Sequence, residues 1–479
     1  MKWNVRKSRL SGAIAIPPSK SHTIRAMLIA TLAQGESHLG NVLTKGDGAS
    51  AISAAQSMGA SVTVSGCSVT VQGVAGNYDL GSDDFNMENS GTSTNLFAAA
   101  AALGSRRRRF DGDSSLRTRP FKPLLVALKN LGAEYSMENN KSDLPFAIAG
   151  PIKGGRTVVN GVSSQFVSSL LFSCPCAPQD TRIDVENLHE RPYVEMTMHW
   201  LDRLRIRYEA SPPFGDASLF RDFQGSEASP SFEDASLFRD FQGSEASPSF
   251  EDAEASPSFE DAEASPGRIS FLVRGRQTYP AIDYTVPGDF SSATFAAVAA
   301  PLTGSVLTLH GLDFSDPQGD KGVFDVLAGM GASVEKSGTA TVVNGIKKVK
   351  ATVIDLNAMP DSLPAFSVLG CVAKGETRIV NVAQARIKET DRITVMAEEL
   401  AKMGADIREE KDGLLIRPHR LVGAHVNGHG DHRVVMALAL AGMVAEGETI
   451  IDDAEAAAVT YPTFLEDFKR LGADIEEME

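Results

Sequence analysis

The sequence is poor in cysteine and has no long apolar run. Its 479 residues include four cysteines, too few for a disulfide framework, which fits a reducing compartment. The longest apolar run, 434–445, is interrupted by Gly442 and is too short to span a bilayer. The basic N-terminus is not followed by the apolar stretch of a secretory signal. We therefore expect a cytoplasmic protein that does not insert into a membrane.

Signatures of metal and nucleotide sites are also missing. Cys174 and Cys176 have no second Cys or His pair at zinc spacing, so we expect a buried structural role for them. The fingerprints GxxxxGK[ST] and GxGxxG are absent. One basic cluster occurs, at 106–109, and its pattern favours a solvated loop over a nucleic-acid surface. We expect no metal, no cofactor and no nucleic-acid partner.

The net charge of −15 is concentrated in one segment, 209–267, which holds 14 acidic and 2 basic residues. The tetrapeptide EASP recurs there, beginning at Glu209, Glu227, Glu245, Glu254 and Glu263. Near-identical copies rich in Ser, Pro, Glu and Asp cannot bury enough apolar surface to offset chain entropy. We expect a flexible, low-complexity surface insertion, with partner binding as the alternative.

A weaker repeat organises the rest of the chain. Each copy has a small polar residue at a helix start, an Ala-rich helix, a β-branched strand, an amphipathic helix and a further strand. Five copies close on a Gly-Ala step, at Gly59, Gly132, Gly331, Gly404 and Gly472, whereas the third closes at Leu204-Arg205-Ile206. Segments 377–382 and 448–451 alternate as strands do. Three units before the insertion and three after it predict an α/β protein of two similar domains with a cleft between them.

Several of the predicted helix starts carry groups that bind anions. Helix N-termini present free amides, and Lys, Arg or hydroxyl side chains beside them add to the attraction. Together they indicate a substrate with several negative charges. The segments are Lys20 to Arg25, Asn89 to Thr92, Ser163 to Gln165, Arg386 to Arg392 and Gly430 to Arg433, with two further arginines at Arg117 and Arg119.

These motifs, in this order, resemble the 5-enolpyruvylshikimate-3-phosphate synthase family, and the match covers the chain except 209–267. The resemblance implies two inside-out α/β domains, each of three βαβαββ units, with the active site in the interdomain cleft. The implied first domain is 18–286 and the second is 1–17 with 287–479. The motifs are Pro18-Ser19-Lys20-Ser21, Asn89-x-Gly91-Thr92, Ser163-Ser164-Gln165, Arg191-Pro192-Tyr193, Pro287-Gly288-Asp289, Lys388-Glu389-Thr390-Asp391-Arg392 and Asp431-His432-Arg433.

The resemblance also implies an activity, transfer of the enolpyruvyl group of phosphoenolpyruvate to the 5-hydroxyl of shikimate 3-phosphate in the shikimate pathway, with glyphosate as an inhibitor. It implies a cytoplasmic monomer without cofactor. The residues implied for shikimate 3-phosphate are Lys20, Ser21, Arg25, Ser163, Ser164, Gln165, Tyr193, Asp361, Gln384 and Lys388. Those implied for phosphoenolpyruvate are Lys20, Gly91, Arg117, Arg392 and Arg433. The implied catalytic residues are Lys20, Asp361, Lys388 and Glu389, and two carboxylates of differing pKa would suit the two proton transfers.

Three positions depart from the commonest family pattern, at Asn95, Glu190 and Val459. A carboxylate at Glu190 would repel the substrate phosphate. Two alternatives are UDP-N-acetylglucosamine enolpyruvyl transferase and a non-catalytic phospholigand-binding relative. The first usually has a cysteine in a mobile loop, whereas Cys67 is expected in a strand and Cys174 in a helix.

Overall fold

The computed structural model describes residues 1–138, 142–212, 269–345 and 348–478. Within them, the strands form six four-stranded sheets. In four of these sheets the strands lie in the order first, second, fourth and third along the chain. In the other two, β14 (Asp283–Thr285) lies at the edge next to β3 (Glu36–Gly40), and β1 (Lys2–Arg6) lies between β23 (Glu448–Asp452) and β24 (Asp474–Met478). The first two strands of each sheet pair parallel and the others antiparallel. The predicted α/β class and the six copies of one unit are confirmed.

The buried side chains form two clusters, and each cluster defines a lobe. The first lobe contains three sheets, ordered β14-β3-β5-β4, β6-β7-β9-β8 and β10-β11-β13-β12. Its helices are α1 (Lys20–Leu32), α2 (Asp47–Ser57), α3 (Gly91–Ala101), η1 (Leu116–Thr118), α4 (Lys122–Asn130), α5 (Ser164–Ser173), η2 (Cys174–Cys176) and α6 (Arg191–Arg203). Its strands are β3 (Glu36–Gly40), β4 (Ser61–Ser65), β5 (Ser68–Gln72), β6 (Asp84–Asn86), β7 (Arg108–Asp111), β8 (Glu134–Met137), β9 (Phe146–Ala149), β10 (Gly155–Asn160), β11 (Thr181–Glu186), β12 (Tyr208–Ser211), β13 (Ile269–Val273) and β14 (Asp283–Thr285).

The second lobe contains the sheets β2-β15-β17-β16, β18-β19-β21-β20 and β22-β23-β1-β24, so two N-terminal strands complete it. Its helices are α7 (Phe290–Thr303), η5 (Gly319–Lys321), α8 (Gly322–Met330), η6 (Pro360–Ser362), α9 (Leu363–Gly370), η7 (Ala383–Ile387), α10 (Arg392–Lys402), α11 (His432–Gly442), η8 (Ala454–Val459) and α12 (Phe464–Leu471). Its strands are β1 (Lys2–Arg6), β2 (Gly12–Ala15), β15 (Val306–His310), β16 (Ser333–Ser337), β17 (Ala340–Asn344), β18 (Val353–Asp355), β19 (Thr377–Val380), β20 (Asp406–Glu410), β21 (Gly413–Arg417), β22 (His425–Asn427), β23 (Glu448–Asp452) and β24 (Asp474–Met478).

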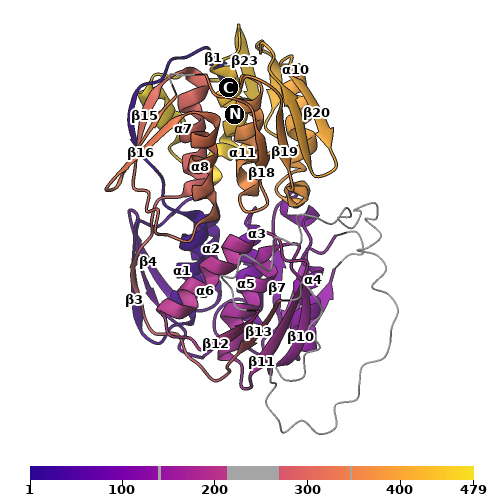
Figure 1. The fold of residues 1–479 in the computed structure, drawn as a ribbon. Coiled ribbons are helices and arrows are strands. Elements are labelled where there is room, and N and C mark those ends of the chain that lie inside the picture. The colour runs from indigo at the N-terminus through magenta and orange to yellow at the C-terminus, as the bar shows by residue number, and fades with distance from the viewer. Residues whose placement is uncertain (139–141, 213–268, 346–347, 479) are drawn as a thin grey trace.

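One helix of each unit is buried along almost its whole length: α1, α3 and α5 in the first lobe, and α7, α9 and α11 in the second. These helices are rich in Ala and Ser, whose small side chains let neighbouring helices and sheets approach from all sides. Figure 1 shows the result, with helices inside each lobe and strands along the outer faces. The inside-out arrangement agrees with the sequence expectation.

The repeated glycines end the amphipathic helices. Their φ angles lie between 83° and 108°, in the left-handed region where a Cβ is disfavoured, as a C-cap prediction requires. In the third copy Arg205 takes the equivalent position with φ 56°. The non-glycine residue explains why that copy lacks the Gly-Ala signature.

The chain passes between the lobes at two adjacent segments. Pro18 and Gly288 form an isolated antiparallel bridge. Beside it, the Ser19 amide donates to the Pro287 carbonyl at 2.8 Å and the Asp289 amide to the Pro17 carbonyl at 2.9 Å. The two crossings therefore lie side by side.

Some sequence expectations need correction. Residues 209–211 belong to β12, so the first residues assigned to the insertion are part of a sheet, while 213–268 lie outside the described residues. Arg108 is not in a solvated loop, because β7 buries it fully and its guanidinium donates to the carbonyls of Tyr78 and Leu80. Cys67 is exposed in the turn between β4 and β5, not in a strand.

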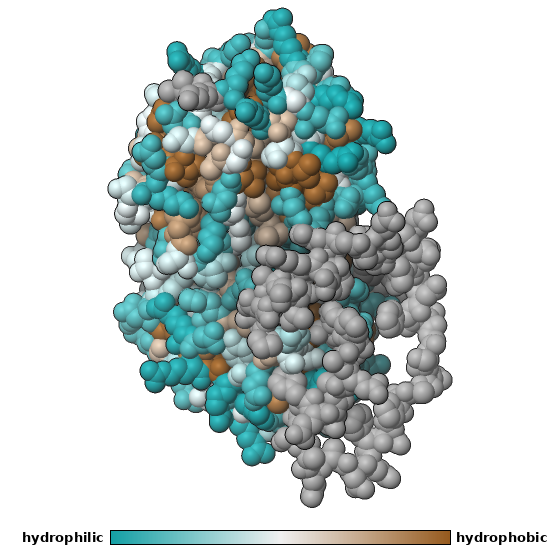
Figure 2. All heavy atoms as spheres, viewed as in Figure 1, coloured by the Kyte–Doolittle hydropathy of each residue, from teal (hydrophilic) through white to brown (hydrophobic). Residues whose placement is uncertain are grey.

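The surface and the remaining cysteines follow the expected pattern more closely. Figure 2 shows hydrophilic side chains over most of the visible face. Cys174 and Cys371 are buried, Cys176 is half-buried, and all four cysteines, which lie in the described ranges, are free thiols. No helix in the described part of the chain is both long and apolar enough to cross a membrane.

Candidate active site

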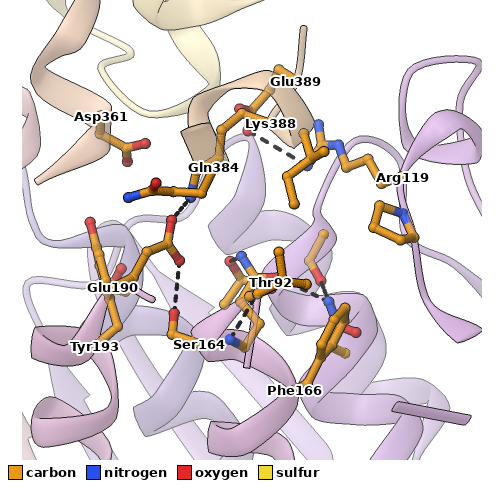
Figure 3. A pocket seen from close by; sticks show the side chains of 18 of the residues that line it. Thr92, Arg119, Ser164, Phe166, Glu190, Tyr193, Asp361, Gln384, Lys388 and Glu389 are labelled. Carbon is orange, nitrogen blue, oxygen red and sulfur yellow. Dashed lines mark hydrogen bonds and ion pairs between the residues drawn. The ribbon is translucent and has the colours of Figure 1, made fainter. Parts of the chain in front are cut away.

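A pocket lies between the lobes, with about 880 Å³ of empty space that includes open solvent at its mouth. Side chains from both lobes line it (Figure 3). The first lobe supplies Lys20, Ser21, Arg25, Asp47, Gly91, Thr92, Asn95, Arg119, Pro120, Phe121, Val162, Ser163, Ser164, Gln165, Phe166, Glu190 and Tyr193. The second supplies Asp361, Gln384, Ile387, Lys388 and Glu389.

Three buried helices of the first lobe begin at this pocket. Their N-caps are Ser19, Ser90 and Ser163, and each side chain accepts a hydrogen bond from an amide of the first turn. The helix starts therefore present partial positive charge and amide donors to the cavity. This geometry agrees with the anion-binding interpretation of the sequence.

Arg25 is held rigidly at the wall of the pocket. Its guanidinium donates to Thr197 Oγ1 at 3.1 Å and to the Tyr193 carbonyl at 3.0 Å. Burial lowers the pKa of Arg25 to about 10, so the side chain remains charged at neutral pH. The Tyr193 hydroxyl crosses to the second lobe and donates to Asp320 Oδ2 at 2.9 Å.

Gln165 belongs to an amide network on the floor of the pocket. Its Nε2 donates to Thr92 Oγ1 at 3.1 Å, and its Oε1 accepts from Asn95 Nδ2 at 2.9 Å. Asn95, which departs from the family pattern, therefore orients a predicted substrate-binding residue. A neutral amide at this position adds no cation to the pocket.

The two predicted proton-transfer carboxylates share one buried arginine. Arg392 donates to Asp361 Oδ1 at 2.7 Å and to Glu389 Oε2 at 2.6 Å, and it also contacts Asp431 at 2.8 Å. Arg433 Nη2 lies 3.4 Å from Asp361 Oδ2. Its Nε and Nη1 atoms have no hydrogen-bond partner among the described residues, so this buried cation retains unused donors.

These arginines control the protonation of both carboxylates. Burial would raise the pKa of Asp361, but Arg433 and Arg392 hold it well below its ordinary value. Burial acts on Glu389 in the same way, and Arg392 and Arg119 likewise hold its pKa well below the ordinary value. The pKa values of both carboxylates are therefore shifted in the same direction, and Arg392 contributes to both shifts.

Other cations that line the pocket also face carboxylates. Lys388 forms an ion pair with Glu190, and Lys20 Nζ lies 3.4 Å from Asp47 Oδ2. The lining contains four cationic and four acidic side chains, so its formal charge is zero. The residues are Lys20, Arg25, Arg119 and Lys388 against Asp47, Glu190, Asp361 and Glu389.

Arg117 is a predicted site residue that lies away from the pocket and its carboxylates. It is half-exposed and donates to the Asp111 carboxylate at 2.9 and 2.8 Å. Arg119 lines the pocket instead, with Nη1 3.6 Å from Glu389 Oε1. Arg392 and Arg433 lie behind Asp361 and Glu389, and the other predicted residues line the cavity directly.

Sequence reasoning named Arg119 among the anion-binding arginines but gave the site role to Arg117, and it missed Asp47 and Asp320. Arg119 had a usable signal, because a residue before proline is restricted to extended backbone, and its φ of −84° and ψ of 149° end the η1 turn. Asp320 is buried in η5, and burial together with Asp361 raises its pKa to about 6. Nothing in its local sequence marks it. Within the described residues, no group of three or more His, Cys, Asp or Glu could hold a metal ion.

Comparisons with known proteins agree with this geometry. The family model described as EPSP synthase (3-phosphoshikimate 1-carboxyvinyltransferase) matches residues 5–213 and 261–468. A protein of Acetivibrio thermocellus named 3-phosphoshikimate 1-carboxyvinyltransferase is 43% identical over 479 residues, with 100% of both chains covered. One of the same name from Ruminiclostridium cellulolyticum is 40% identical, with 99% of this chain and 100% of the relative covered.

Solved structures share the fold. An EPSP synthase structure from Acinetobacter baumannii superposes with a TM-score of 0.72 at 23% identity, covering 99% of this chain and 100% of that one. This likeness extends over both lobes.

Proposed function

The chain belongs to the EPSP synthase family, and on this premise we propose that its cleft transfers the enolpyruvyl group of phosphoenolpyruvate to the 5-hydroxyl of shikimate 3-phosphate, with release of phosphate. It is a carboxyvinyltransferase of the shikimate pathway, which leads to aromatic amino acids. The observation that carries the proposal is the pairing of two carboxylates, Asp361 and Glu389, with cations at a pocket formed by both lobes. The alternative acceptor, UDP-N-acetylglucosamine, is not favoured.

We propose that the first lobe holds shikimate 3-phosphate. Capped helix starts and the hydroxyl and amide groups beside them supply neutral donors, while Lys20, Arg25 and Lys388 supply charge. The proposed set is Lys20, Ser21, Arg25, Ser163, Ser164, Gln165, Tyr193, Asp361, Gln384 and Lys388. All ten residues line the pocket, seven from the first lobe and three from the second, which supports the assignment.

Phosphoenolpyruvate is proposed to contact Lys20, Gly91, Arg119, Arg392 and Arg433. The unused Nε and Nη1 donors of Arg433 support this assignment, because a buried cation gains most from an incoming anion. Arg119 replaces Arg117 in the set. Since Arg392 and Arg433 also contact Asp361, an incoming anion competes with the carboxylate for them.

That competition gives the carboxylates their function. While the arginines contact them, both carboxylates are ionised and can only accept protons. When substrate anions draw the arginines away, the pKa values of Asp361 and Glu389 rise and either group can carry a proton. One accepts the proton of the 5-hydroxyl as its oxygen attacks C2, and the other delivers a proton to C3. The resulting methyl group then returns a proton as phosphate leaves, and cations stabilise that leaving group.

The domain division, assembly and location follow as further proposals. We place the first domain at 18–286 and the second at 1–17 with 287–479, which the two separate hydrophobic clusters support. A monomer is proposed because one chain supplies every group of the pocket. Buried free thiols at Cys174 and Cys371 support a cytoplasmic location, since such thiols persist in reducing compartments.

A phosphate-release assay tests the activity. Purified protein is given phosphoenolpyruvate with shikimate 3-phosphate or, separately, with UDP-N-acetylglucosamine. Phosphate release with the first acceptor alone is the expected result. Release only with the second, or with neither, would contradict the proposal.

A further inference from the structure

Glu190 occupies an unusual position at the start of α6. It has left-handed backbone, with φ 53° and ψ 41°, a conformation that is uncommon for residues with a side chain. The turn directs its side chain into the pocket, where the residue is only 2% exposed. Figure 3 shows the carboxylate between Ser164 and Lys388.

Both carboxylate oxygens are engaged. Oε2 accepts a hydrogen bond from Ser164 Oγ at 2.9 Å, and Oε1 forms an ion pair with Lys388 Nζ. Ser164 belongs to the first lobe and Lys388 to the second, so Glu190 joins the two walls of the pocket. Burial lowers the pKa of Lys388, but Glu190 and Asp361 outweigh this and raise it, which keeps the ammonium charged.

The same two donors belong to the set proposed for shikimate 3-phosphate. A serine hydroxyl has one proton and can donate one hydrogen bond, so it cannot serve a carboxylate and a phosphate together. A phosphate that reached both donors would also lie beside the Glu190 carboxylate, and like charges at such a distance repel strongly in a buried site. The arrangement is therefore that of an anion site already filled by a side chain of the protein.

We propose that Glu190 is an internal competitor for the phosphate of shikimate 3-phosphate and thereby sets the affinity for this substrate. The proposal rests on the proposed function. Binding requires the carboxylate to leave Ser164 and Lys388, and the phosphate then takes both donors. The lining, neutral while Glu190 faces the cavity, gains one positive charge when the carboxylate withdraws.

Two substitutions at Glu190 separate the effect of its charge from the effect of its side-chain length. Glu190→Asn removes the charge and shortens the side chain, and Asn tolerates left-handed backbone. Glu190→Gln keeps the length and removes only the charge. Glu195→Gln is the matched control, because Glu195 is a half-exposed carboxylate on the same helix that pairs with Arg191 at 2.8 Å and does not line the pocket. Thermal melting of each variant establishes that it is folded.

Isothermal titration with shikimate 3-phosphate, and with inorganic phosphate as a minimal probe, measures the effect. Glu190→Asn should bind both ligands at least about 10-fold more tightly than the parent protein. Glu190→Gln should show the part of this gain that is due to charge, and Glu195→Gln should bind as the parent does. In steady-state assays the gain should appear in KM for shikimate 3-phosphate and not in KM for phosphoenolpyruvate.

Unchanged or weaker binding of shikimate 3-phosphate by a folded Glu190→Asn variant would overturn the competitor role. That result is distinct from failure of the proposed function. If the proposed function fails, the parent protein itself neither binds shikimate 3-phosphate nor turns it over.

Discussion

At the scale of single residues, the chemistry of the cleft depends on two buried arginines, Arg392 and Arg433, that share carboxylate partners. Arg392 is 1% exposed and contacts Asp361, Glu389 and Asp431. Arg433 adds a second buried guanidinium beside Asp361. Removing one member of such a cluster leaves buried charge without compensation, which costs more than the intact cluster contributes. The cluster therefore couples stability to the protonation of groups proposed for catalysis.

Arg392→Ala should lower the free energy of unfolding at pH 7.5 by about 3–5 kcal/mol. Asp361 and Glu389 have depressed pKa values in the native parent protein, so their stabilisation is complete above the unfolded values and is lost as pH falls. In the variant, burial without the arginine raises those pKa values. The difference between the two proteins should therefore shrink below about pH 5, where the carboxylates of the variant and of the unfolded chains take up protons.

Urea unfolding at pH 7.5 and pH 4.5 measures this difference. Arg417→Ala is the control, because Arg417 is 55% exposed and pairs with Glu376 at the surface. It should change stability by less than about 1 kcal/mol at either pH. A loss for Arg392→Ala that is the same at both pH values would argue against the carboxylates as its cause.

Glu389→Gln should reduce turnover by at least about 100-fold, because the amide keeps the shape but cannot exchange the proton. Binding of shikimate 3-phosphate, followed by titration, should change little. Glu376→Gln makes the same substitution at a half-exposed site and should leave turnover as in the parent. Normal turnover in the purified Glu389→Gln protein would remove this carboxylate from the mechanism.

At the scale of elements, the short helix η1 decides which arginine reaches the pocket. Leu116 is buried and anchors the turn, and Arg117 projects to the surface and pairs with Asp111. Arg119 follows in extended backbone before Pro120 and faces Glu389. Arg117 and Arg119 are only two positions apart, but one pairs with Asp111 at the surface and the other faces Glu389 in the pocket.

Arg119→Ala should therefore lower kcat/KM for phosphoenolpyruvate by at least about 100-fold, as expected when a buried contact to a charged group is lost. Arg117→Ala is the matched control, and its kcat/KM should stay within about 3-fold of the parent value. Steady-state kinetics of both variants measure the contrast. Equal losses would mean that the loop rearranges when substrate binds.

The repeated elements were predictable from sequence, and several side-chain positions were not. Capping residues, Ala-rich helices and glycines with positive φ act locally, so strands β19 and β23 and the helix starts at Ser163 and Asp431 fall within a few residues of their predicted places. The burial of Arg108 and the contact of Glu190 with Lys388 depend on partners far along the chain. Local pattern contains no information on such partners, which is why both residues were misjudged or left open.

At the scale of the whole molecule, contacts across the cleft are made by side chains of opposite charge or by hydrogen bonds. His22 Nε2 lies 3.0 Å from Asp316 Oδ1, and the Tyr193 hydroxyl donates to Asp320. The ion pair of Glu190 and Lys388 crosses the same gap. A substrate anion that uses Lys388 must therefore displace the Glu190 carboxylate. Ligand affinity and lobe association are coupled through these pairs.

The segment 213–268 should be dispensable for folding and activity. Its ends are fixed by β12 and β13, which pair antiparallel with Ser211 opposite Ser270, so a short turn can join them. The family model also leaves 214–260 unmatched.

Replacing 213–268 with Asn-Gly removes 13 acidic and 3 basic residues and changes the formal charge from −15 to −5. Because a shorter loop loses less entropy on closure, the variant should be more stable by about 2 kcal/mol. Its kcat and both KM values should stay within about 2-fold of the parent values, since described residues outside this segment supply the groups on which the proposed function depends. Urea unfolding and phosphate-release kinetics measure these quantities, with a scrambled segment of equal length and composition as the control. A variant that is less stable or less active than the parent, while the scrambled protein matches the parent, would show that loop length matters and sequence does not. Loss in both would show that the segment makes specific contacts.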